Sequence, residues 1–217
     1  MIEIFGIPIA EPMTTLTDYL LAAVSAYLAW RLFQQTAGQR SRKYWALASI
    51  FIGLAAFWGG TYHGFQAILS ETQLVFCWQM VVYSVGLSTF FCTYGTAIAT
   101  LPFKLHKWML SFALIKLAVC IIWVQWNTAF LYVIIDYLIA LLFIVAMQTY
   151  AKFRQGAPSY NYILAGVIVF FIGTGVQRSG IALHEYLNHN DLLHLLQIVA
   201  VVLFYRGTLL FFDVPKL

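Results

Sequence analysis

The sequence predicts an all-α polytopic membrane protein with seven transmembrane helices. Its composition, the spacing of its apolar runs and the position of its basic residues carry this prediction. Of 217 residues, 62% are hydrophobic and only 9% are charged, whereas a soluble domain carries about 25% charged residues. This composition excludes a soluble enzyme. The net charge of +4 is small and lies beside the apolar runs, which excludes nucleic acid as a partner.

Seven apolar runs are each long enough to cross a bilayer, which takes about 20 residues in a helix. In chain order they are separated by the polar joints QQTAGQRSRK, SET, PFKLHK, a break near Asn127, AKFRQGAPSY and LHEYLNHN. We expect the fourth and fifth runs to form a tight hairpin at that break. The whole chain, 1–217, then forms a single transmembrane domain. The predicted spans are 14–33, 44–63, 73–99, 108–126, 128–149, 160–178 and 191–211.

The basic residues predict the orientation of the bundle. Ten of the twelve cations lie in alternate joints or at the span ends beside them, and an excess of Lys and Arg marks cytoplasmic loops. We therefore expect the N-terminus outside and the C-terminus in the cytoplasm, which an odd number of spans satisfies. The ten residues are Arg31, Arg40, Arg42, Lys43, Lys104, Lys107, Lys152, Arg154, Arg206 and Lys216.

Polar residues converge at the outer end of the predicted bundle. His63 closes the second span, and Asn190, Asp191 and His194 begin the seventh. Polar groups at membrane depth usually face the bundle interior or a watery cavity, and His63 and His194 are expected at similar depths. Imidazole and carboxylate groups at one level suit a zinc ion with about four ligands.

Other interpretations of these residues stay open. Asn190 or Asp191 fits the role of N-cap of the last helix, and His63 with His194 fits bis-histidine haem ligation. Glu11 and Asp18, near the start of the first span, lie on one helix face because they are about two turns apart. His184 and His189 lie in a short loop, where solvated side chains are the simpler interpretation.

The motifs GGTYHGF (59–65) and HNDLLHLLQIVAVVLFYRG (189–207) resemble the CREST superfamily. Its members are the alkaline ceramidases, the progestin and adipoQ receptors and the lipid-remodelling hydrolases of the GPI-anchor pathway. Together with EPMTTLTDYL, these motifs are also similar to an uncharacterised bacterial branch, which implies a bacterial cytoplasmic (inner) membrane. The resemblance implies seven spans and zinc ligation by His63 and His194. Asn190 stands where the family has a further histidine ligand, and Gly59 where it has a serine.

The resemblance further implies a metal-dependent hydrolase that cleaves a lipid amide or ester at an outward-facing site. The third metal ligand is left open between Asp191, Asn190 and His189, and Asp191 or Glu71 is the candidate proton acceptor. The predicted substrate contacts are Arg178 for an anionic head group, and Trp58 and Trp78 for an acyl chain.

A function of another class fits the composition equally well. In it the chain is a non-catalytic sensor or accessory subunit that binds a lipid or an ion in the same cavity. The expected partners are membrane lipid and either a second copy of the chain or another membrane subunit.

Lys116 and Asp136 are the two charges deepest in the predicted membrane region. Lys116 lies eleven residues before Asn127 and Asp136 nine after it, so at 1.5 Å per residue the two reach nearly the same depth. An unpaired charge there is costly, which predicts a structural ion pair. A proton relay is the functional alternative.

Overall fold

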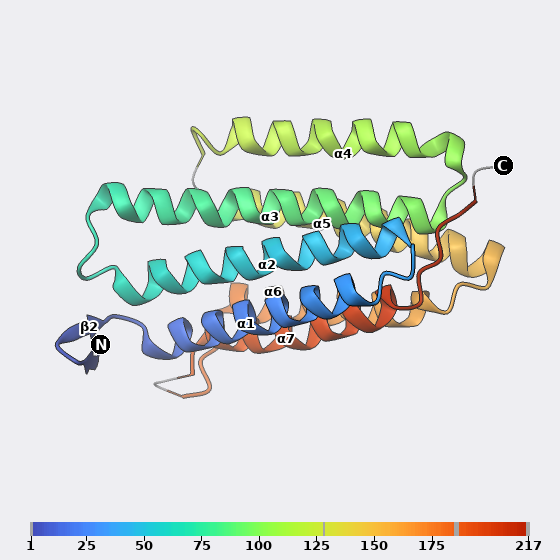
Figure 1. Cartoon of the computed structure of the whole chain (residues 1–217). Helices are drawn as coiled ribbons and strands as arrows, with labels where there is room; N and C mark the ends of the chain where they lie inside the picture. Colours follow the sequence, from blue (N-terminus) through green and yellow to red (C-terminus); the bar gives the residue numbers. More distant parts are fainter. Residues whose placement is uncertain (1, 128, 185–186, 216–217) are drawn as a thin grey trace.

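The computed structural model describes residues 2–127, 129–184 and 187–215, and these form seven long helices (Figure 1). The all-α prediction is confirmed. Thr128, the predicted first residue of the fifth span, lies outside the described residues. So does Lys216, one of the predicted cytoplasmic cations. The helices are α1 (Pro12–Gln34), α2 (Arg40–Phe65), α3 (Glu71–Thr100), α4 (Phe103–Trp123), α5 (Phe130–Gln155), α6 (Ser159–Ser179) and α7 (His189–Thr208).

Local sequence signals set several helix ends. Ser70 begins α3 with a capping box, in which its hydroxyl accepts from the Gln73 N–H. Pro12 occupies the first turn of α1, where a missing N–H costs nothing. Gly156 ends α5 with a φ of +67°, a conformation that glycine adopts without steric cost. Helix α5 continues up to this glycine and ends at Gln155, six residues beyond the predicted end of the fifth span at residue 149.

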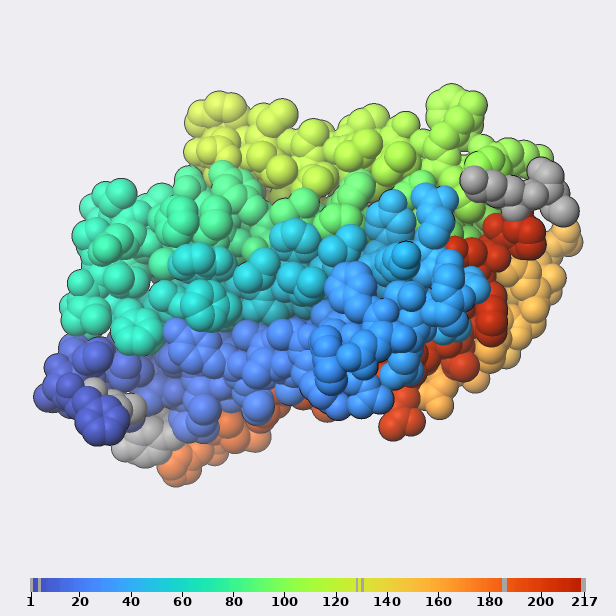
Figure 2. All heavy atoms as spheres, viewed as in Figure 1, coloured from blue at the N-terminus to red at the C-terminus, as the bar shows by residue number. Residues whose placement is uncertain are grey.

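The chain begins with a small β-hairpin that the apolar periodicity did not predict. Strands β1 (Ile2–Ile4) and β2 (Ile7–Ile9) pair antiparallel around Phe5 and Gly6, which have φ values of 51° and 78°. Positive φ at both turn residues matches the twist of a two-residue hairpin. The Ala10 N–H donates to the Gly64 carbonyl oxygen at 2.9 Å. The hairpin is therefore fixed to the end of α2, where it projects from the bundle (Figure 2).

Six of the described helices, α2 to α7, are long and apolar enough to cross a membrane. Helix α1 differs because Thr14, Thr15, Thr17 and Asp18 are all buried on its inner face. Its 23 residues still extend about 34 Å, comparable to the hydrocarbon core of a bilayer. The polar character of α1 is directed into the protein.

The helices run antiparallel along one common direction, with α1 between α2 and α7 (Figure 1). Helix α3 packs against α2, α4 and α5, whereas the backbones of α4 and α5 make few close contacts and α4 stands as a separate ridge along one edge (Figure 2). The fourth and fifth spans therefore do not pack backbone against backbone as the expected tight hairpin does, although side chains such as Phe112 and Phe143 meet between them. Both helices also pack on α3.

The two ends of the bundle have different chemistry. At the histidine end, α1 and α7 begin and α2 ends, which gathers Glu11, Asp18, His63 and His194. At the basic end, α1, α5 and α7 end and α2, α4 and α6 begin, which gathers those predicted cytoplasmic cations that the structure describes. The N-terminal hairpin and the described C-terminal residues lie at opposite ends (Figure 1).

Candidate functional site

Glycines on α2 allow α1 to approach closely at the histidine end. A Cβ added to Gly60 would lie 2.9 Å from the Tyr19 ring, and one on Gly64 would lie 2.7 Å from Thr15 Oγ1. Both distances are too short for a real Cβ, so only glycine fits. At Gly59 the neighbour is the Asp18 carboxylate, 3.2 Å from the added Cβ. The Asp18 carboxylate therefore lies against Gly59.

His194 of α7 faces two side chains of α1. Its Nε2 lies 3.3 Å from Asp18 Oδ1, and its Nδ1 lies 3.1 Å from Thr17 Oγ1. All three residues are buried. The second oxygen of Asp18, Oδ2, has no hydrogen-bond partner among the described residues, although a buried carboxylate oxygen normally requires one.

The Thr17 hydroxyl constrains the proton position on His194. Its oxygen lies 3.0 Å from the Met13 carbonyl oxygen and 3.1 Å from the Thr14 carbonyl oxygen. A threonine within a helix commonly donates its hydroxyl hydrogen to a backbone carbonyl of the preceding turn. When the hydroxyl donates to one of these, its oxygen accepts from His194 Nδ1–H. Nε2 then directs a lone pair toward Asp18, and only a proton or a metal ion between the two atoms removes their repulsion.

His63 of α2 contacts the carboxylate of Glu11, which precedes α1. The distance from His63 Nδ1 to Glu11 Oε1 is 3.2 Å, and Gln66 Nε2 donates to the same oxygen at 3.1 Å. The hydrogen bond with His63 lowers the pKa of Glu11, and partial burial acts in the opposite direction. This second carboxylate–histidine pair leaves Nε2 of His63 free of the Glu11 contact.

Asp191 belongs to the capping box of α7. Asn188 is the N-cap, and its side-chain oxygen accepts from the Asn190 and Asp191 N–H groups. Asp191 Oδ2 accepts from the Asn188 N–H at 2.8 Å, whereas the buried Oδ1 has no partner among the described residues. The expectation that Asn190 or Asp191 is the N-cap of the last helix is therefore wrong: the N-cap is Asn188, and Asp191 completes the capping box as the third residue of α7.

A cavity of about 370 Å³ opens behind these side chains, at the lower end of the range for small-ligand pockets. Asp18, His63 and His194 line it at the histidine end, together with His189 and Asn190. The lining continues along α2 as far as Trp45, about 27 Å from His63 along the helix axis. All described helices except α4 contribute to this mostly apolar wall.

Within the described ranges, no three His, Cys, Asp or Glu side chains come together as a ready metal-binding group. The pair His194 and Asp18 supplies two donor atoms. His63 lines the same cavity but does not complete a group with them.

The model of a protein family of unknown function, DUF6962, matches residues 13–211, nearly the whole chain. The chain belongs to DUF6962. Neither the curated proteins nor the solved structures contain a significant match to it. The matched range includes every residue of the two carboxylate–histidine pairs except Glu11.

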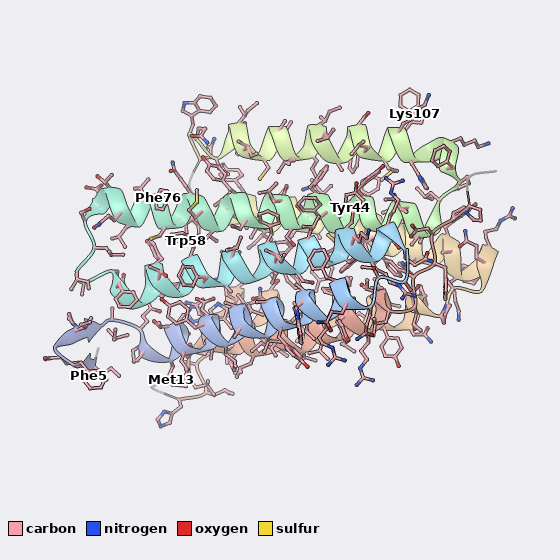
Figure 3. The ribbon with its side chains drawn as sticks, in the orientation of Figure 1. Phe5, Met13, Tyr44, Trp58, Phe76 and Lys107 are labelled. Atoms are coloured by element: carbon pink, nitrogen blue, oxygen red, sulfur yellow. The ribbon has the colours of Figure 1, made fainter. Side chains whose placement is uncertain are left out.

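In this DUF6962 chain the predicted substrate contacts separate into two groups. Trp78 lines the cavity, but Trp58 does not; it packs edge-on against Phe76 across the α2–α3 interface (Figure 3). Arg178, at the end of α6, and Glu71, at the start of α3, are exposed and do not line the cavity.

Asp18 and Thr17 are the cavity-end residues missing from the predicted site. The signal was available, because Glu11 and Asp18 share one face of the first helix. What the sequence did not indicate was that this face meets the start of α7. In the DUF6962 chain, the carboxylate beside His194 therefore comes from the first helix.

The predicted buried charges Lys116 and Asp136 lie in contact, with Lys116 Nζ 2.5 Å from Asp136 Oδ1. Thr89 of α3 joins them: it donates to Asp136 Oδ2 and accepts from Lys116. Thr89 also lines the cavity. The polar groups of this triad therefore lie beside the cavity wall, deeper in the bundle than the histidine end.

Proposed function

We propose that this chain is a seven-span protein of a bacterial cytoplasmic membrane, with its N-terminus outside, and that its cavity binds one single-chain amphiphile. In this proposal the apolar tail lies along the inner walls of α2, α3 and α5, and the head group lies at the histidine end. The single observation that carries it is a narrow apolar cavity that ends at a buried carboxylate–histidine cluster.

The unpartnered atoms at the histidine end indicate which head group fits. Asp18 Oδ2 and Gln177 Oε1 are both buried acceptors without a partner among the described residues, and both residues line the cavity. A buried acceptor without a donor costs free energy. An amine, hydroxyl or amide N–H on the ligand supplies that donor, so a donor-bearing amphiphile is the expected class.

Two amphiphiles with the same tail test this proposal. The chain in phosphatidylcholine nanodiscs is titrated calorimetrically with dodecylamine and with dodecanoate, and empty nanodiscs give the background of partitioning. We expect dodecylamine to bind at least about tenfold more tightly, because hydrogen bonds to a charged group are strong. Preference for dodecanoate contradicts the head-group assignment, and binding no stronger than to empty nanodiscs contradicts the function.

Metal-dependent hydrolysis of a lipid amide or ester is the second candidate function. Tetrahedral zinc ligands at 2.0–2.1 Å lie roughly 3.3–3.4 Å from each other, and Asp18 Oδ1 lies 3.3 Å from His194 Nε2. The proton constraint from Thr17 and the free Asp18 Oδ2 favour a cation at this position. The resemblance to the CREST hydrolases supports His63 as a further ligand.

In this second candidate, zinc supplies a Lewis acid that activates water at neutral pH. Asp18 and His194 are the residues that would hold it, with His63 across the cavity. Glu11 orients the His63 ring through Nδ1, as carboxylates commonly do for metal-binding histidines. Asp191 remains part of the capping box of α7.

Elemental analysis of the purified chain separates the two functions. The hydrolase candidate predicts about one zinc per chain, lost in Asp18→Asn and His194→Ala and retained in His184→Gln, a loop histidine outside the cavity. Zinc absent from folded wild-type protein after zinc has been supplied contradicts it. The binding function does not require the metal.

A further inference from the structure

A second cavity lies at the basic end, away from the histidine end. Its volume is about 740 Å³, and its walls come from Arg40 of α2, Tyr94 of α3 and the first turns of α4. No residue lines both cavities. It opens where α4, the peripheral helix, begins, and Lys107 extends from α4 at this end (Figure 3).

Three cations line this cavity without an acidic partner. Arg40, Lys104 and Lys107 are exposed side chains, and none takes part in the ion pairs of the described residues. Asp213 is the acid that contacts the backbone of Arg40. Its carboxylate is already engaged, because it accepts from Ser41 Oγ and from the N–H groups of Arg40 and Ser41.

The start of α4 adds to the positive potential. Pro102 is its N-cap and provides no side-chain hydrogen bond to the first N–H groups, whereas Asp213 provides this at the start of α2. Uncapped N–H groups and the helix dipole favour an anion. The start of α4 therefore lacks a negative charge such as the one that the Asp213 carboxylate supplies at the start of α2.

The remaining walls suit the glycerol and upper acyl carbons of a lipid. Phe103, Leu105, Trp108 and Leu110 line the cavity, and Lys107 Nζ lies 5.3 Å from the centre of the Trp108 ring. Buried His106 also lines it, with Nε2 bonded to the Leu101 carbonyl at 2.9 Å. A free inorganic anion would use the cations but not these apolar walls.

We propose that this cavity binds one anionic phospholipid, with the phosphate between Arg40, Lys104 and Lys107 and the acyl chains along the exposed apolar side of α4. Basic pockets between helices at a cytoplasmic membrane surface recognise such head groups. The occupant differs from the amphiphile of the histidine end in charge and in place. The inference rests on the proposed membrane orientation but not on amphiphile binding at the histidine end.

Native mass spectrometry of the full chain in non-ionic detergent tests the inference. The chain is titrated with dioleoylphosphatidylglycerol and with dioleoylphosphatidylcholine, which differ in net charge. The variant Lys104→Gln/Lys107→Gln removes two pocket cations. Lys152→Gln/Arg154→Gln is the control, because it removes two cations at the same end, on α5, outside the cavity.

We expect wild-type protein to prefer phosphatidylglycerol, and the pocket variant to weaken that binding about 30-fold. The control should keep the wild-type affinity within about threefold. Equal affinity for both lipids in wild-type protein overturns the inference, as does an equal loss in the control. Displacement of bound phosphatidylglycerol by millimolar inorganic phosphate assigns the site to a free anion and also overturns it.

Discussion

The two buried charge clusters of this protein differ in how completely their atoms are paired. In the triad of Lys116, Asp136 and Thr89, both carboxylate oxygens and the ammonium have partners. At the histidine end, Asp18 Oδ2 and Asp191 Oδ1 are buried without partners among the described residues. A fully paired cluster has nothing left to offer a ligand, whereas an incompletely paired one beside a cavity has.

This difference separates structural from ligand-binding roles. Breaking the triad leaves an unpaired charge and should lower stability. Changing Asp18 should mainly alter what the cavity binds.

Asp136→Asn is expected to lower the free energy of unfolding by about 3–5 kcal/mol, because it leaves Lys116 buried without a counter-charge. The double variant Lys116→Met/Asp136→Leu should recover most of this loss, since apolar residues of similar size often replace a buried pair at little cost. Reversible unfolding in mixed detergent micelles measures both. A neutral single variant would show that the triad is not structural.

Asp18→Asn is expected to weaken dodecylamine binding by at least about tenfold while the free energy of unfolding falls by less than about 1 kcal/mol. The reason is that Asp18 Oδ2 has no partner to lose in the protein. Calorimetric titration in nanodiscs and the same unfolding assay check the two parts. A large loss of stability with unchanged binding would place Asp18 with the structural cluster.

Gly60→Ala is expected to cost about 1–3 kcal/mol, because its Cβ would press on the Tyr19 ring and on Asp18 Cβ. Gly59→Ala is the matched control one residue earlier. Its Cβ would meet the Asp18 carboxylate at 3.2 Å, which we expect to cost less than about 1 kcal/mol. Thermal unfolding compares the two. Equal losses would contradict the close α1–α2 packing at Gly60.

The Glu11–His63 pair should give the smallest effect, a few tenths of a kcal/mol, because both side chains are partly exposed. The folded-state pKa of Glu11 lies below its ordinary value of 4.5. The stabilising contribution is therefore present above about pH 4.5 and is lost as the pH falls through the folded-state pKa. Glu11→Gln should flatten the pH dependence of unfolding in this acidic range. An unchanged slope would contradict the pairing.

The sequence predicted the helical class and the approximate extents of the helices because long apolar runs depend only on local composition. It also located Lys116 and Asp136 at one depth, since both positions are counted from the same break in the chain. The position of Asp18 was harder to predict. Asp18 lies beside His194 because α1 packs against α7, and this packing joins residues far apart in the sequence: Thr17 and His194, which are in contact, are 177 residues apart. No periodicity within one helix reports which helices are neighbours.

The N-terminal hairpin and the peripheral position of α4 escaped prediction for similar reasons. The hairpin rests on two positive-φ residues, Phe5 and Gly6, and phenylalanine is not a typical residue for that conformation. The position of α4 is set by α3, which packs against both α4 and α5. A short connection near Asn127 indicated neighbours in sequence but not their packing.

The central claim, that the interior cavity holds one amphiphile, is tested most directly by native mass spectrometry of the chain released from membrane-derived nanodiscs. Ala55→Phe fills the cavity, and its neighbour Leu54→Phe changes a side chain that does not line it. We expect one adduct with the mass of a single-chain amphiphile on wild-type and Leu54→Phe protein and none on Ala55→Phe protein, whereas a phospholipid adduct of the basic end is expected on all three. The same amphiphile adduct on all three proteins, or no such adduct on folded wild-type protein, would contradict the central claim.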